Sequence, residues 1–82
     1  MKAWHCFSES PEYGNLLVYA ENRNRARFLS LRSAWDWDYI YVNAIRANPK
    51  FDDLFNVEKI IESNDDLPKT HKFYALDDEL AW

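Results

Sequence analysis

The alternation of apolar and polar side chains predicts three β-strands in the first 46 residues of the chain. Residues 2–8 and 16–21 both have the composition of strands, and Pro11 and Gly14 between them are turn formers. Residues 39–46 show the clearest alternation, with every second side chain on the same face of a sheet. We therefore expect a hairpin of the first two strands, with the third strand added after a helix.

The helix is predicted over residues 23–34, because Asn22 is a residue type that caps helix N-termini. Its apolar side chains form two stripes instead of one. Ala26 and Leu29 suit close packing on a sheet. The second stripe lies nearly opposite and consists of Phe28, Leu31 and Trp35. We expect the C-terminal segment, with its aromatics Phe73, Tyr74 and Trp82, to cover that stripe. A second copy of the chain or a target protein is the alternative cover.

The pattern is weaker beyond residue 46. Residues 51–55 predict a short turn or helical turn, residues 57–62 a short helix or strand, residues 63–68 a loop, and residues 70–76 a last strand. The sequence thus predicts a single α+β domain over residues 1–82. Its antiparallel sheet has three to four strands in β-β-α-β order, with one main helix packed on one face.

The composition is that of a small domain rich in aromatic residues. The chain has 82 residues, of which 48% are hydrophobic and 17% aromatic, with one Gly and one Cys. A single Cys forms no intrachain disulfide. No window approaches the roughly 18 apolar residues of a membrane span. We therefore expect a protein of the cytoplasm, with no membrane partner.

Charge divides the chain into two unlike halves. Residues 1–50 carry seven bases and five acids, whereas residues 51–82 carry nine acids and three bases. Such a division indicates a polarised surface or acids that fold back over the Arg-rich helix.

Candidate chemistry is sparse. His5, Cys6 and His71 are the soft metal-type ligands, but neighbours on a strand point to opposite faces, so His5 and Cys6 do not hold one ion together. Adjacent acids such as Asp52 and Asp53 are typical of caps and solvated loops, and a domain of this size offers little room for a catalytic cleft. We expect no enzyme activity, no metal and no cofactor.

Two motifs occur together in the first two thirds of the chain. A strand ending in Ala20-Glu21 leads into a capped helix with Ala26-Arg27, and a later strand ends in the pattern Arg46-x-x-Pro49-x-x-Asp52. Over residues 2–53 this combination resembles small uncharacterised proteins encoded by bacteriophages and prophages. The resemblance implies a phage or mobile-element origin, a bacterial host cytoplasm, and the binding and inhibition of a host protein.

Residue types favour protein binding as the function. Trp, Tyr and Arg dominate interface hot spots, and this chain has four Trp and five Tyr. An acidic tail beside these rings would steer docking onto a basic surface of a host defence protein, such as a CRISPR-type nuclease complex. The expected partner-contacting residues are three tyrosines, the second helix stripe and three tail acids: Tyr19, Tyr39, Tyr41, Phe28, Leu31, Trp35, Asp77, Asp78 and Glu79.

The alternative is a small single-stranded nucleic-acid-binding protein. The helix arginines would contact phosphates, and Tyr19, Tyr39 and Tyr41 would stack on bases. Against this interpretation, the net charge of the chain is −4 and the arginines divide between two flanks of the helix. Nucleic acid is therefore the less favoured partner.

Overall fold

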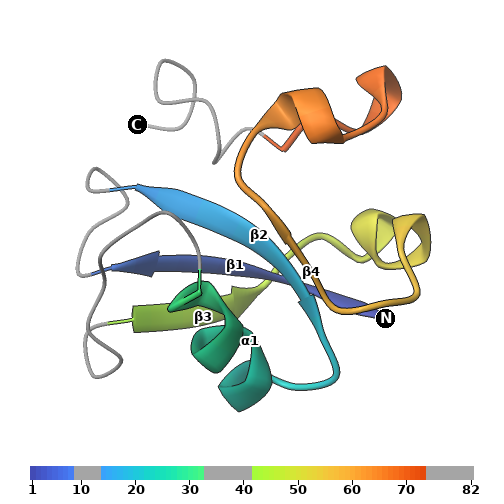
Figure 1. The fold of residues 1–82 in the computed structure, drawn as a ribbon. Coiled ribbons are helices and arrows are strands. Elements are labelled where there is room, and N and C mark those ends of the chain that lie inside the picture. Colours follow the sequence, from blue (N-terminus) through green and yellow to red (C-terminus); the bar gives the residue numbers. More distant parts are fainter. Residues whose placement is uncertain (9–13, 33–41, 74–82) are drawn as a thin grey trace.

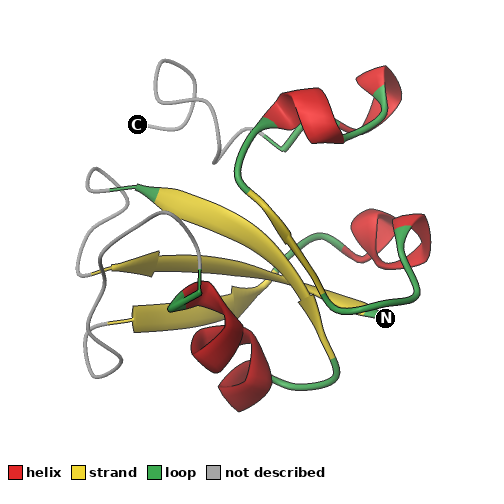
Figure 2. Cartoon of the chain, viewed as in Figure 1, coloured by secondary structure: helices red, strands yellow, loops and turns green. Residues whose placement is uncertain are grey.

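The computed structural model describes residues 1–8, 14–32 and 42–73 (Figure 1). The strands and the α-helix of these ranges are β1 Lys2–Ser8, β2 Asn15–Ala20, α1 Arg23–Ser30, β3 Val42–Arg46 and β4 Lys59–Ile61. Three 3₁₀ turns accompany them: η3 Pro49–Leu54, η4 Asn64–Asp66 and η5 Lys69–His71. The predicted α+β fold is confirmed, with a four-stranded sheet and the helix on one face (Figure 2).

The sheet has the order β3-β1-β2-β4, and each neighbouring pair is antiparallel. β1 and β2 form the predicted hairpin, from the pair Lys2 and Ala20 to the pair Phe7 and Asn15. β3 adds to the other side of β1, so β2 and β3 run in the same direction with β1 between them. The connection through α1 therefore crosses β1 and places the helix over the centre of the sheet.

The helix begins as predicted and ends earlier. The Asn22 side chain accepts a hydrogen bond from the Arg25 backbone N–H at 2.9 Å, which satisfies a free amide of the first turn. α1 ends at Ser30, and the predicted extension through residues 31 and 32 is wrong. Ser30 donates its hydroxyl to the Arg27 carbonyl at 2.6 Å, and the following turn tightens to hydrogen bonds three residues apart. Residues 33 and 34 lie outside the described residues.

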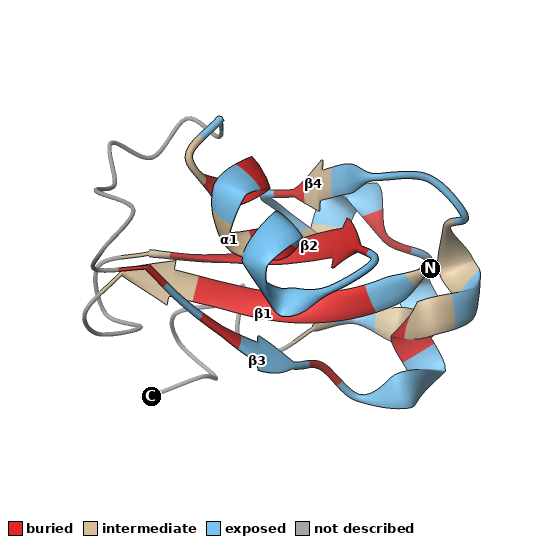
Figure 3. Ribbon diagram, turned by 90° about the horizontal axis from the view of Figure 1, so that it is seen from below, coloured by how far each residue is buried: buried red, intermediate tan, exposed pale blue. Residues whose placement is uncertain are grey.

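Apolar side chains fill both faces of the sheet. The first core lies under α1 and comprises Trp4, Cys6, Leu16, Val18, Ala20, Ala26, Leu29, Val42 and Ala44. The second core lies on the opposite face, under the 3₁₀ turns, and comprises Ala3, Leu17, Tyr19, Ala47, Phe51, Ile61 and Leu67. Figure 3 shows β1 and β2 as largely buried strands in the middle of the sheet. No helix among the described residues is long and apolar enough to cross a membrane.

Tyr19 belongs to the second core. Its ring lies edge-on to Phe55, with 5.0 Å between the ring centres, and its hydroxyl donates to the Phe51 carbonyl at 2.6 Å. None of its surface is exposed. The prediction of Tyr19 as a partner-contacting side chain is therefore wrong for this structure, because residues 47–73 cover the face on which it lies.

The last third of the described chain differs in part from the sequence patterns. Residues 57–62 contain a short strand, β4, and residues 51–55 lie mostly in the helical turn η3. The predicted strand over residues 70–76 is wrong for residues 70–73, the part that the structure describes. The chain forms the turn η5 at this point, and the His71 N–H donates to the Pro68 carbonyl at 2.9 Å. Residues 63–68, predicted as a loop, include η4.

An ion pair and a backbone hydrogen bond attach η3 to the sheet. Asp52 accepts hydrogen bonds from the Ala3 backbone N–H at 2.9 Å and from both terminal nitrogens of Arg46 at 2.9 and 2.6 Å. The bond from Arg46 is the main cause that holds the pKa of Asp52 below its usual range. These bonds fix η3 to the first residues of β1.

Replacing Tyr19 by Phe tests the second core. The Phe51 carbonyl would lose a buried donor, so we expect the free energy of unfolding to fall by about 1–3 kcal/mol. Urea unfolding followed by fluorescence measures this free energy. We expect the midpoint urea concentration to fall, while the slope of the free energy of unfolding against urea concentration stays the same. A midpoint equal to that of the wild type would contradict the buried hydrogen bond.

Candidate binding surface

Phe28 lies on the outer side of α1. The helix packs on the sheet through Ala26 and Leu29, which are buried in the first core. Phe28 points away from that core, and 42% of its surface is exposed. A single exposed apolar side chain is common on a folded surface, so the contacts around Phe28 decide whether it belongs to a site.

Two arginines flank this ring, one from α1 and one from the turn that follows it. Arg25 precedes Phe28 by three residues within the helix, a spacing that brings helical side chains together, and Arg32 lies four residues after Phe28, just beyond the end of α1. Each guanidinium carbon lies 5.3 Å from the centre of the Phe28 ring, within the range of a cation–π contact. The result is an exposed unit of Arg25, Phe28 and Arg32, which we call the Arg–Phe–Arg face.

Glu58 joins this face from a distant part of the chain. Its two carboxylate oxygens accept hydrogen bonds from Arg25, at 2.5 Å from Nε and 2.8 Å from Nη2. This contact lowers the pKa of Glu58, chiefly through the hydrogen bond from Arg25, and Arg32 lowers it further by its charge. Glu58 lies just before β4, so the pair links the helix to the edge of the sheet.

The remaining helix arginines have different surroundings. Arg27 donates from Nε to the Val42 carbonyl at 2.9 Å and so ties α1 to β3. Arg23 is exposed at the first position of the helix. Since α1 contains no acid between Arg23 and Ser30, its outer surface is basic apart from the contribution of Glu58.

The structure separates the sequence-predicted binding residues. Phe28 faces away from the sheet as predicted, and 42% of its surface is exposed, whereas Leu31 is half-buried and packs against the first core, so its place in an outward stripe is wrong. Tyr19 is buried, as described above. The others lie outside the described residues: Trp35, Tyr39, Tyr41, Asp77, Asp78 and Glu79.

We expected three C-terminal aromatic residues to cover the second stripe of the helix. Of these three, the structure describes Phe73. Phe73 packs against the second core, on the face of the sheet away from α1, and Asn64 holds its backbone through two hydrogen bonds of 2.7 and 3.1 Å. Tyr74 and Trp82 lie outside the described residues. Phe73 itself therefore does not cover Phe28.

His5 and Cys6 point to opposite faces of β1, as predicted. Cys6 is buried in the first core, and burial raises the pKa of its thiol to about 12, so the thiolate is absent at neutral pH. The His5 ring lies against the rings of Phe7 and Phe73, at 5.0 and 5.2 Å between centres. Among the described residues, no three His, Cys, Asp or Glu side chains come together as metal ligands.

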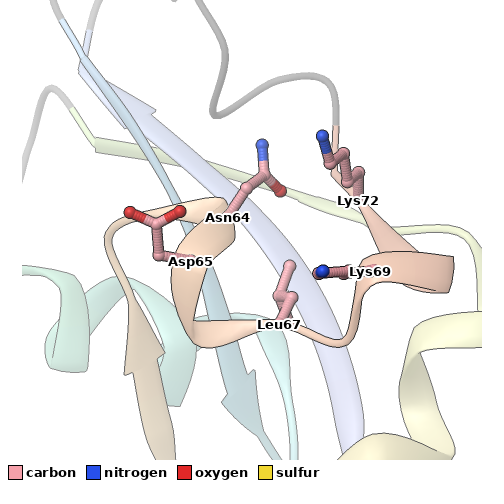
Figure 4. Close-up of a pocket in the computed structure, with 5 residues that line it drawn as sticks. All are labelled: Asn64, Asp65, Leu67, Lys69 and Lys72. Atoms are coloured by element: carbon pink, nitrogen blue, oxygen red, sulfur yellow. The ribbon is translucent and has the colours of Figure 1, made fainter.

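A hollow of about 560 Å³ lies between η4 and η5 (Figure 4). Its described lining consists of Asn64, Asp65, Leu67, Lys69 and Lys72. The close-up shows Asp65 on one side and the two lysines on the other, with Asn64 and Leu67 between them. The lining thus mixes both signs of charge, and none of the predicted binding residues belongs to it.

The buried His5 makes stability depend on pH. Burial lowers the pKa of His5 from 6.5 to about 4, so between these values the unfolded chain binds a proton that the folded chain does not. We therefore expect unfolding to become easier as pH falls from 7 to 5. His5→Phe removes the titrating group. Between pH 7 and pH 5 its free energy of unfolding should therefore fall by about 1–2 kcal/mol less than that of the wild type. Urea unfolding at both pH values measures this difference, and equal losses in the two proteins would contradict it.

Known proteins offer no guide to this surface. Comparison of the chain with protein-family models, with curated proteins and with solved structures finds no match in any of the three. Evidence for the function comes from the geometry of the described residues and from the sequence patterns.

Proposed function

We propose that this chain is a non-enzymatic module that acts by binding another protein, and that the Arg–Phe–Arg face of α1 contacts that protein. The observation that carries the proposal is the exposed Phe28 ring between the Arg25 and Arg32 guanidinium groups. Aromatic rings and arginines contribute most of the binding free energy at protein interfaces, because they bury a large area and also make directional contacts.

The arrangement also reduces the entropy lost on binding. Long arginine side chains lose rotamer freedom when a partner orders them. Here the contacts with the Phe28 ring already restrict both arginine side chains before binding. The backbone below them is fixed by the Asn22 cap and by the buried Ala26 and Leu29. The face is therefore preorganised on a rigid element.

The finer form of the proposal concerns the target. We propose a host protein in the bacterial cytoplasm, and inhibition of a defence system such as a CRISPR-type nuclease complex. The support for this form is the resemblance of residues 2–53 to phage-encoded proteins. The predicted acidic docking residues Asp77, Asp78 and Glu79 would contact a basic surface of the target, and they lie outside the described residues.

A single-stranded nucleic acid is the second candidate partner. The helix arginines favour it, because guanidinium groups bind phosphates well. However, nucleic-acid-binding sheets use several exposed rings to stack bases. Tyr19 is one of the rings that would stack on bases in this alternative, but it is buried and its hydroxyl donates to the Phe51 carbonyl. The described residues thus favour a protein partner.

Replacing Phe28 by Asp tests the proposed face. Immobilised wild-type protein should retain a specific protein from a bacterial lysate, and the Phe28→Asp variant should lose it, since a charge replaces the apolar anchor. Ile45→Asp is the matched control, because Ile45 is 49% exposed on β3, away from α1. Quantitative mass spectrometry of the retained proteins measures the difference. Equal retention by the wild type and Phe28→Asp would contradict the proposal.

An oligonucleotide assay separates the two partner classes. At about 50 mM salt, where contacts with phosphates are strongest, fluorescence polarisation with mixed single-stranded oligonucleotides should show weak or no binding. Robust binding that weakens steeply with added salt would favour the nucleic-acid alternative over the protein partner.

A further inference from the structure

We infer that the Arg–Phe–Arg face takes an acidic segment of the partner protein, and that a partner carboxylate binds Arg25 in place of this chain's own Glu58. The inference rests on the proposed function, because it specifies the chemistry of the partner for the same surface. It also gives Glu58 a role as an internal competitor for the site.

The pair of Arg25 and Glu58 shows the geometry that an incoming carboxylate would adopt. Two N–H groups of Arg25 each donate to one carboxylate oxygen, at 2.5 and 2.8 Å, which is the two-point contact in which arginine is most selective. The side chains of Arg25 and Glu58 are 42% and 35% exposed. A surface pair of this exposure contributes little to stability, so a second carboxylate can compete for it.

Arg32 provides a second contact for the same segment. Its guanidinium lies over the same ring as that of Arg25, yet the described residues give it no ion pair within 4 Å. A segment that places an apolar side chain on Phe28 would therefore have a cation on each side for its carboxylates. The chemistry that fits is an acidic residue on either side of an apolar one.

The charge around the face has the sign that this segment needs. Arg23 adds an exposed cation at the start of α1. The acids that act on Arg25 are Glu58 and Glu21, and of these two Glu58 forms an ion pair with it. Together with Arg25, the exposed Arg23 and Arg32 make this surface attractive to an acidic segment.

The binding of a labelled peptide tests the inference. The probe is a fluorescein-labelled peptide of alternating aspartate and leucine, compared with a peptide in which asparagine replaces aspartate. In fluorescence polarisation at low salt, the wild type should bind the acidic peptide and prefer it to the neutral one. Glu58→Gln should bind it about two- to fivefold more tightly, because Arg25 is released from its internal partner.

Asp66→Asn is the matched control for net charge. Asp66 is an exposed acid of η4, and this replacement changes the charge of the chain by the same amount as Glu58→Gln. We expect it to leave the affinity for the acidic peptide unchanged. Circular dichroism and the thermal midpoint of each variant confirm that the fold is retained. Phe28→Ala should weaken binding of the peptide in both the wild-type and the Glu58→Gln backgrounds.

The outcomes distinguish this inference from the proposed function. Equal affinities of Glu58→Gln and Asp66→Asn would overturn the replacement of Glu58 by a partner carboxylate. Binding of the neutral peptide as tightly as the acidic one, or tighter binding of an oligothymidylate, would overturn the acidic partner. Either result leaves the proposed function in place if lysate capture still depends on Phe28, and that function fails separately if capture does not.

Discussion

The burial of β2 on both of its faces is the constraint on which the rest of the structure depends. All six residues of this strand, from Asn15 to Ala20, are buried, and its side chains alternate between the two cores. A strand of this kind needs a cover on each side of the sheet. In a chain of 82 residues, α1 provides one cover and residues 47–73 provide the other. A domain of this size buries a modest share of its unfolded surface, so both covers are needed for stability.

The two covers are held in different ways. α1 is a regular helix, and it packs through small and branched side chains on β1, β2 and β3. The second cover consists of short 3₁₀ turns and β4, and side-chain hydrogen bonds connect it to other parts of the chain. The Tyr19 hydroxyl donates to the Phe51 carbonyl, the Asp52 carboxylate accepts from the Ala3 N–H, and the Asn64 side chain accepts from the Phe73 N–H. The first of these bonds is buried and the other two are partly buried, so each satisfies a backbone group that has little access to water. Polar side chains thus add to the short turns in holding this cover in place.

The sequence predicted the elements that depend on local patterns. The hairpin, the Asn22 cap and the alternation of Val42 and Ala44 toward the helix follow from periodicity and from short-range chemistry. The burial of Tyr19 depends on contacts with distant residues, which periodicity does not contain. The early end of α1 coincides with the local bond from Ser30 to the Arg27 carbonyl, which the pattern of apolar residues does not show either. Of the candidate site, the position of Phe28 on the side of the helix away from the sheet could be predicted from the helical stripe. Glu58 could not, because it lies 33 positions after Arg25 and no local pattern indicates that pairing.

Both sheet faces carry apolar cores, and the outer side of α1 presents an aromatic ring together with arginines. We propose that this outer side is the binding surface. Titration with the acidic peptide, followed by NMR through the backbone amide chemical shifts, tests this proposal. We expect the largest changes at Arg25, Phe28, Arg32 and Glu58, with the amides of β2 unaffected. Changes centred on Lys69 and Lys72, at the hollow between η4 and η5, with no response from α1, would contradict it.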